Sequence, residues 1–339
     1  MQGQARIVVR YPAKGRGIVL RAGSDWGRDV LPVRVDDDGT RFEFHLAGAG
    51  AFCYFKPLLR DGGAELWSQG ENMLAITRPG SVTTVHPHFA PDASCSVCTL
   101  HQVPSRILDR AAAVRVFLPP GYAENTLARH PVLYMQDGHN LFFPGESLGG
   151  DHWRIAETLQ TLAAMSLVRR AIVVGIHPRD RMAEYTSPGY GDYGRFLCQE
   201  LKPWVDATYR TLPGPADTTV MGSSLGGVVS FYLAWEHPGV FGNAGCLSST
   251  FGWRDDLLDR AASEPPRPIR IYLDSGWPGD NYEVTRAMRD RLLNRGYAEG
   301  KDLLYFAYPR AVHDERHWGM RAHIPFQFFH GRGLAAEAA

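Results

Sequence analysis

Residues 218–230 have the sequence TTVMGSSLGGVVS, in which a short apolar strand pattern leads into a serine between glycines and then into a helical pattern. Gly222 to Gly226 match G-x-S-x-G, with Ser224 at the centre. A serine at so sharp a strand-to-helix turn has a strained backbone and an exposed hydroxyl, and flanking glycines avoid a Cβ clash with the neighbouring chain. The stretch therefore predicts a nucleophile at Ser224, although the same five residues without partners would indicate only a glycine-rich turn before a helix.

Apolar strand patterns and amphipathic helix patterns alternate on both sides of this stretch. The buried strands are predicted at residues 131–135, 171–176, 219–221, 269–273 and 303–307, and the helices between them at 153–164, 193–209, 228–236 and 282–294. This alternation is typical of a mostly parallel sheet that is covered by helices on both faces. We therefore predict an α/β domain over residues 100–333.

The N-terminal part of the sequence has a different pattern of apolar and polar residues. Short alternating strand patterns occur at residues 6–10, 17–21, 31–35, 41–46 and 52–55, with breaks rich in glycine and aspartate and without a helical period. A stretch rich in Pro, Gly, Ser and Thr, between about residues 78 and 100, separates this part from the rest. We predict a small all-β sandwich over residues 1–90.

Candidate partners for the serine follow it in the sequence. A serine hydroxyl becomes a good nucleophile when a histidine takes its proton and a carboxylate fixes the tautomer of that histidine, and in the α/β-hydrolase fold the order is serine, acid, histidine. His313 follows the last predicted strand and is the candidate base. Asp280 and Asp274 follow the preceding strand, with Asp280 as first choice and Asp274 as the reserve. Asp280 could instead only cap the helix that starts at Tyr282, and His313 could be a surface histidine.

The fold also needs donors for a developing oxyanion. The N–H of Leu225, directly after the nucleophile, is the first candidate. The second donor is expected in the loop Gln136-Asp137-Gly138-His139-Asn140, because it follows an early strand and Gly138 permits close backbone approach. We place this second donor on Gly138 or His139, while Asp137 could be a simple turn residue.

The charges of the sequence point to no particular macromolecular partner. Thirty-six basic residues balance 36 acidic residues, which argues against binding to nucleic acid or to anionic lipid. The sequence has no uninterrupted apolar stretch of the kind typical of a secretory signal or a membrane span. A cytoplasmic location without membrane association is therefore expected.

Metal and redox sites are not expected either. Five cysteines, an odd number, favour free thiols over a disulfide framework. Cys95 and Cys98 form a CxxC without a second ligand pair nearby, so we interpret them as linker cysteines. His313 and His317 lack the glutamate that zinc signatures place directly after the first histidine or directly before the second. We therefore expect no metal and no cofactor.

Several runs in the α/β region carry a family resemblance. They are VLYMQDGHNLF at residues 132–142, RMAEYT at 181–186, FLCQELKP at 196–203 with YRT at 209–211, and HDE at 313–315 with Trp318. Together with the glycine-flanked serine, they resemble the putative esterase family, which includes enterochelin-esterase-like hydrolases, esterase D, microbial feruloyl esterases and mycolyltransferases. The resemblance covers about residues 113–329 and implies an α/β-hydrolase fold with Ser224 as nucleophile and His313 as base. It favours Asp280 as the acid. Many members have His-Gly where this sequence has Asp137-Gly138.

The N-terminal module has a shorter resemblance. Residues 52–58, 65–67 and 70–72 resemble the closing strands of early-set sandwiches that precede some esterases and starch-active enzymes. In some of those modules an exposed tryptophan binds glycan, so Trp26 or Trp67 is a possible glycan contact. Such residues more often belong to a core or an interface, which favours a structural or substrate-shaping role.

The sequence thus predicts a serine-dependent carboxylic-ester hydrolase that acts on a small-molecule ester through an acyl-enzyme. The alternatives are an acyltransferase or a peptidase of the same fold, a metal-dependent hydrolase, and a glycan-binding protein with a vestigial hydrolase site. Aromatic residues within 185–193 and 251–253 and at Trp277 suggest an aromatic or bulky substrate. Neither the specificity nor the oligomeric state follows from the sequence.

Overall fold

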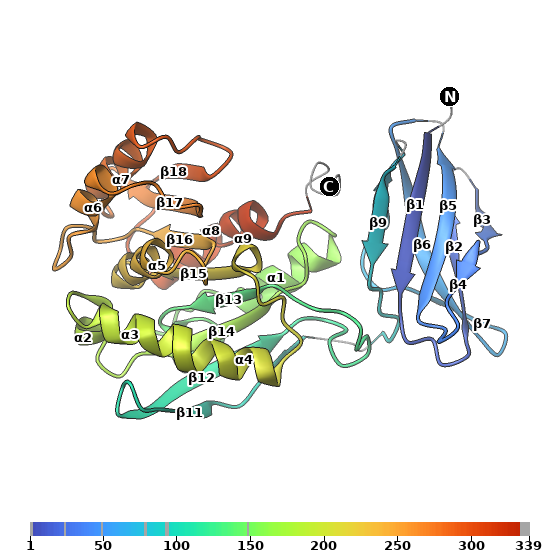
Figure 1. Ribbon diagram of the computed structural model, residues 1–339, viewed down its shortest axis with the longest axis horizontal. Coiled ribbons are helices and arrows are strands. Elements are labelled where there is room, and N and C mark those ends of the chain that lie inside the picture. Colours follow the sequence, from blue (N-terminus) through green and yellow to red (C-terminus); the bar gives the residue numbers. More distant parts are fainter. Residues whose placement is uncertain are drawn as a thin grey trace.

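The computed structural model describes residues 3–23, 25–48, 50–77, 80–91, 95–147 and 149–332. They form an N-terminal β module, β1 to β9, and a larger α/β part, β10 to α9, which lie side by side along the long axis (Figure 1). None of the helices among these residues is long and apolar enough to cross a membrane. All five cysteines are unpaired.

The N-terminal β module consists of two sheets. One sheet has the order β4-β5-β1-β9, and the other has the order β3-β2-β6-β7 with β8 paired to β6. The bounds are β1 (Gly3–Arg10), β2 (Gly17–Ala22), β3 (Asp25–Val30), β4 (Arg34–Val35), β5 (Arg41–Gly48), β6 (Phe52–Asp61), β7 (Ala64–Trp67), β8 (Met73–Ile76) and β9 (Val82–Val85). Ile7, Leu20, Phe44 and Phe55 are fully buried in their common core, which confirms the predicted all-β sandwich.

One strand of this module was placed wrongly from the sequence. The strand predicted at residues 31–35 is confined to the two residues of β4, and β3 lies just before it instead. Leu31 and Val33 are 67% and 59% exposed, so their alternation does not match a buried face. Pro32 has no N–H to donate to a ladder, which favours the break at this point.

The α/β part is built on a nine-stranded sheet. Its order is β10-β12-β14-β13-β15-β16-β17-β18, with β11 paired to β12. The pairs from β14 to β18 are parallel, and β12 runs antiparallel to β14. The bounds are β10 (Ser96–Val97), β11 (His101–Ser105), β12 (Arg110–Leu118), β13 (Val132–Met135), β14 (Ile172–His177), β15 (Thr218–Ser223), β16 (Asn243–Leu247), β17 (Arg270–Trp277) and β18 (Leu303–Pro309).

Helices cover both faces of this sheet, and alternate strand residues point into the two cores. On one face, Leu133 and Val173 pack with residues of α1 (Ile155–Ala164), α8 (Glu315–Arg321) and α9 (His323–His330). On the other face, Tyr134 and Val174 pack with the remaining helices, which include α2 (Arg181–Tyr185), α3 (Tyr190–Phe196), α4 (Lys202–Thr208), α5 (Leu225–Glu236), α6 (Leu257–Ser263) and α7 (Tyr282–Asn294). A π-helical turn, Leu197–Leu201, joins α3 to α4, so the helix predicted at 193–209 is one composite element.

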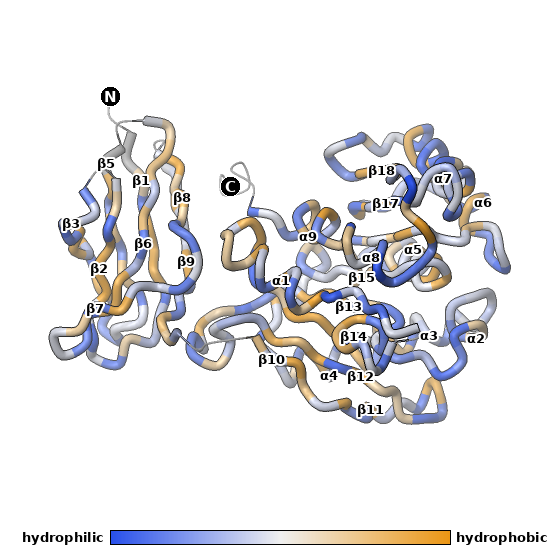
Figure 2. Tube along the Cα trace, turned by 180° about the vertical axis from the view of Figure 1, so that it is seen from behind, coloured by the Kyte–Doolittle hydropathy of each residue, from blue (hydrophilic) through white to orange (hydrophobic). Residues whose placement is uncertain are grey.

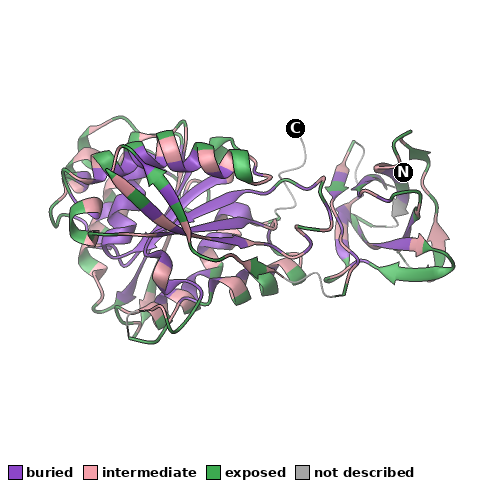
Figure 3. Cartoon of the chain, turned by 90° about the horizontal axis from the view of Figure 1, so that it is seen from below, coloured by how far each residue is buried: buried purple, intermediate pink, exposed green. Residues whose placement is uncertain are grey.

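Burial and hydropathy follow this layering. The inner strands β13 to β17 of the central sheet are buried, while the edge strand β18 and the outer faces of the flanking helices are more exposed (Figure 3). Apolar residues concentrate along the strands of both parts (Figure 2). The structure therefore confirms the predicted mostly parallel α/β fold with helices on both faces, preceded by an all-β region.

The two parts are connected by the chain between β9 and β10 and by side-chain contacts. Asn125 of the α/β part donates to the carbonyl oxygens of Arg10 and Pro87 at 3.0 and 2.8 Å. Residues 78–79 and 92–94 of the predicted linker, and residue 333 at the predicted domain end, lie outside the described residues. The division into domains at 1–90 and 100–333 stays a prediction.

Candidate active site

Ser224 lies at the sharp turn between β15 and α5. Its backbone has φ 56° and ψ −122°, a conformation that costs free energy for a residue with a Cβ. Its N–H donates to Leu247 O of β16 at 2.9 Å. A Cβ on Gly222 would lie 2.7 Å from the carbonyl carbon of Gly226 and 2.9 Å from Gln136 Cβ. The glycine at this position therefore lets β15, α5 and the loop after β13 come together at Ser224.

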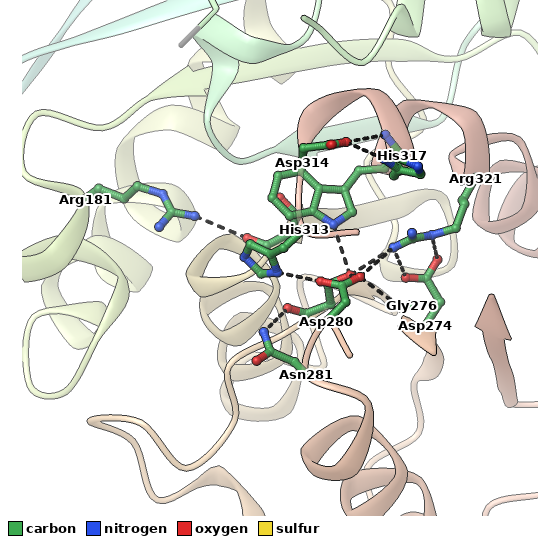
Figure 4. A network of polar contacts seen from close by, with 12 residues as sticks. Arg181, Asp274, Gly276, Asp280, Asn281, His313, Asp314, His317 and Arg321 are labelled. Carbon is green, nitrogen blue, oxygen red and sulfur yellow. Dashed lines mark hydrogen bonds and ion pairs between the residues drawn. The ribbon is translucent and has the colours of Figure 1, made fainter. Parts of the chain in front are cut away.

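His313 and Asp280 meet at the same edge of the sheet. His313 follows β18, Asp280 follows β17, and His313 Nδ1 lies 2.6 Å from Asp280 Oδ1 (Figure 4). The His313 ring also packs edge-on against Trp318, with the ring centroids 4.8 Å apart. Only 2% of the Asp280 side chain is exposed, against 39% of the His313 side chain. The buried carboxylate therefore fixes one ring nitrogen of a histidine that keeps access to solvent.

The second carboxylate oxygen of Asp280 is also held. Oδ2 accepts hydrogen bonds from Ser248 Oγ at 2.6 Å and from Gly276 N at 2.8 Å. Burial alone would raise the pKa of Asp280, but the hydrogen bonds from His313, Ser248 and Gly276 outweigh burial and hold the pKa below its usual value. The helix after it is capped at Asn281 without a side-chain hydrogen bond, so Asp280 is not simply a capping residue.

Asp274, the reserve acid, has other partners. Its side chain is fully buried and accepts from Arg321 Nε and Nη2 at 3.0 and 2.9 Å and from Tyr272 Oη at 2.8 Å. Burial raises the pKa of Asp274, and Arg321 opposes this rise. Arg321 Nη2 also lies 3.9 Å from Asp280 Oδ2 and donates to Ser248 Oγ at 2.9 Å. Asp274 is thus part of the support beneath Asp280 and makes no contact with His313 (Figure 4).

The nucleophile candidate connects to this pair through β16. Leu247 accepts from Ser224 N, and the next residue, Ser248, donates to Asp280. Within the described part of the chain, the Ser224 hydroxyl makes no hydrogen bond. The structure therefore joins His313 to Asp280 and places both at the strand edge that carries Ser224, but does not join His313 to Ser224. Catalytic hydrogen bonds are often formed only once substrate is bound.

The loop predicted to supply the second oxyanion donor is a short 3-10 turn, Gly138–Asn140. A Cβ on Gly138 would lie 2.5 Å from the carbonyl carbon of Gly175, so the turn packs directly on β14. Among the described residues, the N–H groups of Gly138, His139 and Leu225 have no acceptor. All three candidate donors are therefore available, while the choice between Gly138 and His139 stays open.

Arg181 and Asp137 form a contact that the sequence reasoning missed. Arg181 Nε lies 2.9 Å from Asp137 Oδ1, and its Nη2 donates to Asp137 Oδ2 at 3.0 Å and to Ser223 O at 3.3 Å. Burial lowers the pKa of Arg181, but the charge and hydrogen bonds of Asp137 raise it by more. The net shift of the pKa is therefore upward. Arg181 thereby ties the oxyanion loop to the residue before Ser224. In the sequence, the only indication of a role for Arg181 was its position in the RMAEYT run at residues 181–186.

Among the described residues, no cluster of histidine, cysteine or carboxylate side chains is arranged to hold a metal ion. His317, four residues after His313, bonds through Nδ1 to Asp314 Oδ1 at 2.7 Å (Figure 4). His313 and His317, the two histidines considered for a metal site, therefore contact different carboxylates, Asp280 and Asp314.

The model of the family described as "Putative esterase" matches residues 105–320. The chain belongs to the putative esterase family. It is 31% identical over 144 residues to the uncharacterized protein YjcH of Bacillus subtilis, across 41% of this chain and 56% of that protein. It is 23% identical over 177 residues to the uncharacterized protein YbbA of the same organism, across 48% and 66%. The match thus spans less than two thirds of either relative.

Solved structures of named esterases share the fold. A ferric enterobactin esterase from Salmonella typhimurium has a TM-score of 0.55 at 17% identity, covering 92% of this chain and 88% of that one. A ferulic acid esterase from Anaeromyces mucronatus has a TM-score of 0.56 at 18% identity, covering 71% and 92%. An IroE-like serine hydrolase from Shewanella oneidensis has a TM-score of 0.53 at 23% identity, covering 68% and 78%.

The aromatic residues of this putative esterase that were considered for substrate contact divide into two groups. Trp253 and Trp277 are 43% and 49% exposed. Phe251, Tyr185, Tyr190 and Tyr193 are buried at 7% exposure or less, and they belong to one hydrophobic core. Only the two tryptophans are therefore accessible to a ligand.

Proposed function

We propose that this chain is a serine-dependent carboxylic-ester hydrolase with Ser224 as nucleophile, His313 as general base and Asp280 as the residue that orients the base. The observation that carries the proposal is the 2.6 Å contact between His313 Nδ1 and Asp280 Oδ1 at the strand edge that carries Ser224. Membership of the putative esterase family supports ester hydrolysis as the reaction.

In this mechanism the Ser224 hydroxyl attacks the ester carbonyl while His313 Nε2 accepts its proton. Asp280 holds Nδ1 protonated and stabilises the imidazolium that forms. The N–H groups of Leu225 and of Gly138 or His139 stabilise the negative charge on the carbonyl oxygen. The intermediate collapses, the C–O bond breaks, and the alcohol leaves with the proton from His313. Water, activated by the same histidine, then cleaves the acyl-enzyme and releases the acid and free Ser224.

The proposed substrate is a small ester with an apolar or aromatic group. Trp277 ends β17, three residues before Asp280, and Trp253 lies on the segment after β16. Both are exposed, and large exposed aromatic side chains favour apolar contacts. Two of the structural neighbours are a ferric enterobactin esterase and a ferulic acid esterase. A glycan contact through Trp67, which is 39% exposed, stays a secondary proposal.

Steady-state hydrolysis of a series of p-nitrophenyl esters tests the proposal. Ser224→Ala is expected to lower kcat/KM by a factor on the order of 10⁴ with the fold intact, because the variant lacks the hydroxyl that attacks the ester. The matched control is Ser223→Ala, one residue earlier, whose side chain is buried at 4% exposure and is expected to leave turnover within a few-fold of wild type. Wild-type turnover by Ser224→Ala would refute the proposal.

A further inference from the structure

A cavity of about 240 Å³ lies between the N-terminal β module and the α/β part. Its polar lining comes from both sides: Gln69, His86 and His88 belong to the module and the segment that follows it, and Gln160, Ser166 and Arg170 belong to the α/β part. A ligand in this cavity would therefore contact both parts of the molecule at once. We call it the interdomain cavity.

The interdomain cavity lies at the opposite edge of the sheet from Ser224. Arg170 stands two residues before the start of β14, and Pro120, which also lines the cavity, stands two residues after the end of β12. These two positions are neighbours because β12 runs antiparallel to β14. Ser224, Asp280 and His313 instead follow the carboxyl ends of parallel strands. The cavity is thus distinct from the proposed catalytic site.

Arg170 is the main charged group of the cavity. Its Nη1 donates to Pro120 O at 2.9 Å and contacts His88 Nδ1 at 2.8 Å, and its Nη2 donates to His86 O. All three acceptors are uncharged, and no carboxylate of the described residues forms an ion pair with Arg170. Burial lowers the pKa of Arg170 to about 10, and the nearby charge of Arg332 lowers it further, while Glu124 opposes the shift. Arg170 is only partly exposed, and a largely desolvated guanidinium without a counterion is energetically unfavourable.

The described residues that line the cavity do not supply the missing negative charge. They include no aspartate and no glutamate. Burial lowers the pKa values of His86 and His88 to about 4, so both rings are neutral at pH 7.

Glu124 is the carboxylate that acts on Arg170 from outside the lining. Its oxygens already accept from Tyr11 Oη at 2.9 Å and from the N–H groups of Phe89 and Ala90 at 2.8 and 3.0 Å. It therefore fixes the segment after the β module and forms no ion pair with Arg170 among the described residues.

We propose that the interdomain cavity binds a small oxyanion, a carboxylate or phosphate group, with Arg170 as its charged ligand. A guanidinium presents its N–H donors in a planar fork that matches two oxygens of such a group. Arg170 still has its Nε–H and one Nη2–H, and Ser166 and Gln69 line the same space as neutral donors. Because the anion would contact both parts, it would stabilise their docking.

Titration calorimetry on the full chain tests this proposal. Inorganic phosphate and acetate are titrated separately, with sodium chloride at matched ionic strength as the blank, so that the two sources of the oxyanion are distinguished. Wild type is expected to bind at least one of them with a 1:1 stoichiometry. At a hundredfold excess over Kd, that anion is expected to raise the melting temperature by about 4 °C.

Two variants assign the binding to the cavity. Arg170→Gln removes the charge and is expected to weaken binding by about 10- to 100-fold. Ala163→Met fills the cavity from the last turn of α1 without replacing any hydrogen-bond partner of Arg170, and is expected to abolish binding. Arg169→Gln is the matched control, since this neighbouring arginine pairs with Asp217 at 2.6 Å and does not line the cavity, and it is expected to bind like wild type.

Binding heat from phosphate or from acetate that is lost in the cavity variants supports the proposal. The anion that gives the heat identifies which oxyanion the cavity binds. No heat beyond the chloride blank in wild type overturns it. Binding that survives unchanged in Ala163→Met places the anion elsewhere and also overturns it. If Arg170→Gln fails to fold, as judged by circular dichroism, Ala163→Met alone decides.

Discussion

Asp274 and Asp280 are six residues apart and both buried, yet their partners give them different roles. Asp280 orients His313 and has a lowered pKa, whereas Asp274 neutralises Arg321 and has a raised pKa because of burial. The difference comes from β17: Asp274 lies within the strand, and Asp280 lies on the loop beyond it. Asp280 therefore takes part in the proposed chemistry, and Asp274 stabilises the structure beneath Asp280.

Replacing each acid by its amide separates these roles. Asp280→Asn is expected to lower kcat by a factor on the order of 10⁴ with little loss of stability, because the amide no longer holds His313 in the reactive tautomer. Asp274→Asn is expected to lower the free energy of unfolding by about 3–5 kcal/mol, because Arg321 is left without its buried partner.

Kinetics and urea denaturation of the two amide variants check this pair of outcomes. The assignment fails if folded Asp274→Asn loses turnover to the same extent as Asp280→Asn. It also fails if Asp280→Asn keeps the wild-type kcat.

At the scale of elements, the turn after β13 is held against the turn after β15 by Arg181 of α2. Asp137 has a left-handed backbone, with φ 53°, and its N–H donates to Tyr185 Oη of the same helix at 3.2 Å. Helix α2 therefore contacts the oxyanion loop through two side chains. We therefore propose that Arg181 is a positioning residue that acts through Asp137.

Arg181→Lys keeps the charge but cannot form the planar two-point contact with Asp137. We expect kcat to fall by about 10- to 100-fold with an almost unchanged KM, because the donors on Gly138 or His139 move relative to the developing oxyanion. The matched control is Arg179→Lys, an exposed arginine two residues earlier. A change in KM alone, or equal losses in both variants, would count against the positioning role.

The elements that were predicted and those that were missed differ in a physical way. The strands β13, β14, β15, β17 and β18 each contain a run of apolar residues, and the sequence indicates them directly. Strand β16 was missed because it contains Asn243 and Gly245, residue types that are depleted in strands. A Cβ on Gly245 would lie 2.8 Å from Met221 Cγ, so close packing with β15 favours glycine there.

The sequence also predicted only part of the candidate site. Residue spacing and strand order were enough to select Ser224, His313 and Asp280 as candidates. The contacts of Ser248 with Trp318 and Arg321 join residues 70 and 73 positions apart, and nothing local in the sequence indicates them. Such long-range polar contacts depend on how the strand ends and α8 pack.

At the scale of the whole molecule, several histidines are buried in their neutral form. Burial lowers the pKa values of His130 and His330 to about 3 and that of His177 to about 4. The unfolded chain therefore binds more protons than the folded chain once the pH falls below about 6.5. Stability is fully present above this value and is lost as the pH falls toward the folded pKa values.

His330→Gln tests this dependence, since His330 is 2% exposed and contacts Thr219 Oγ1 at 2.9 Å. Between pH 4 and 6, each such histidine contributes a slope of about 1.4 kcal/mol per pH unit to the free energy of unfolding. The variant is expected to be less acid-sensitive by about this slope, as measured by urea denaturation across pH. The surface variant His323→Gln serves as control, and identical slopes for all three proteins would contradict the prediction.

The central claim, that Ser224 is the nucleophile, is tested most directly by mass spectrometry of the chain after reaction with a fluorophosphonate. We expect one adduct per chain, located by peptide mapping on Ser224 and not on Ser223, and absent from Ser224→Ala. A wild-type chain that hydrolyses esters but carries no adduct, or carries it on another residue, would contradict the account.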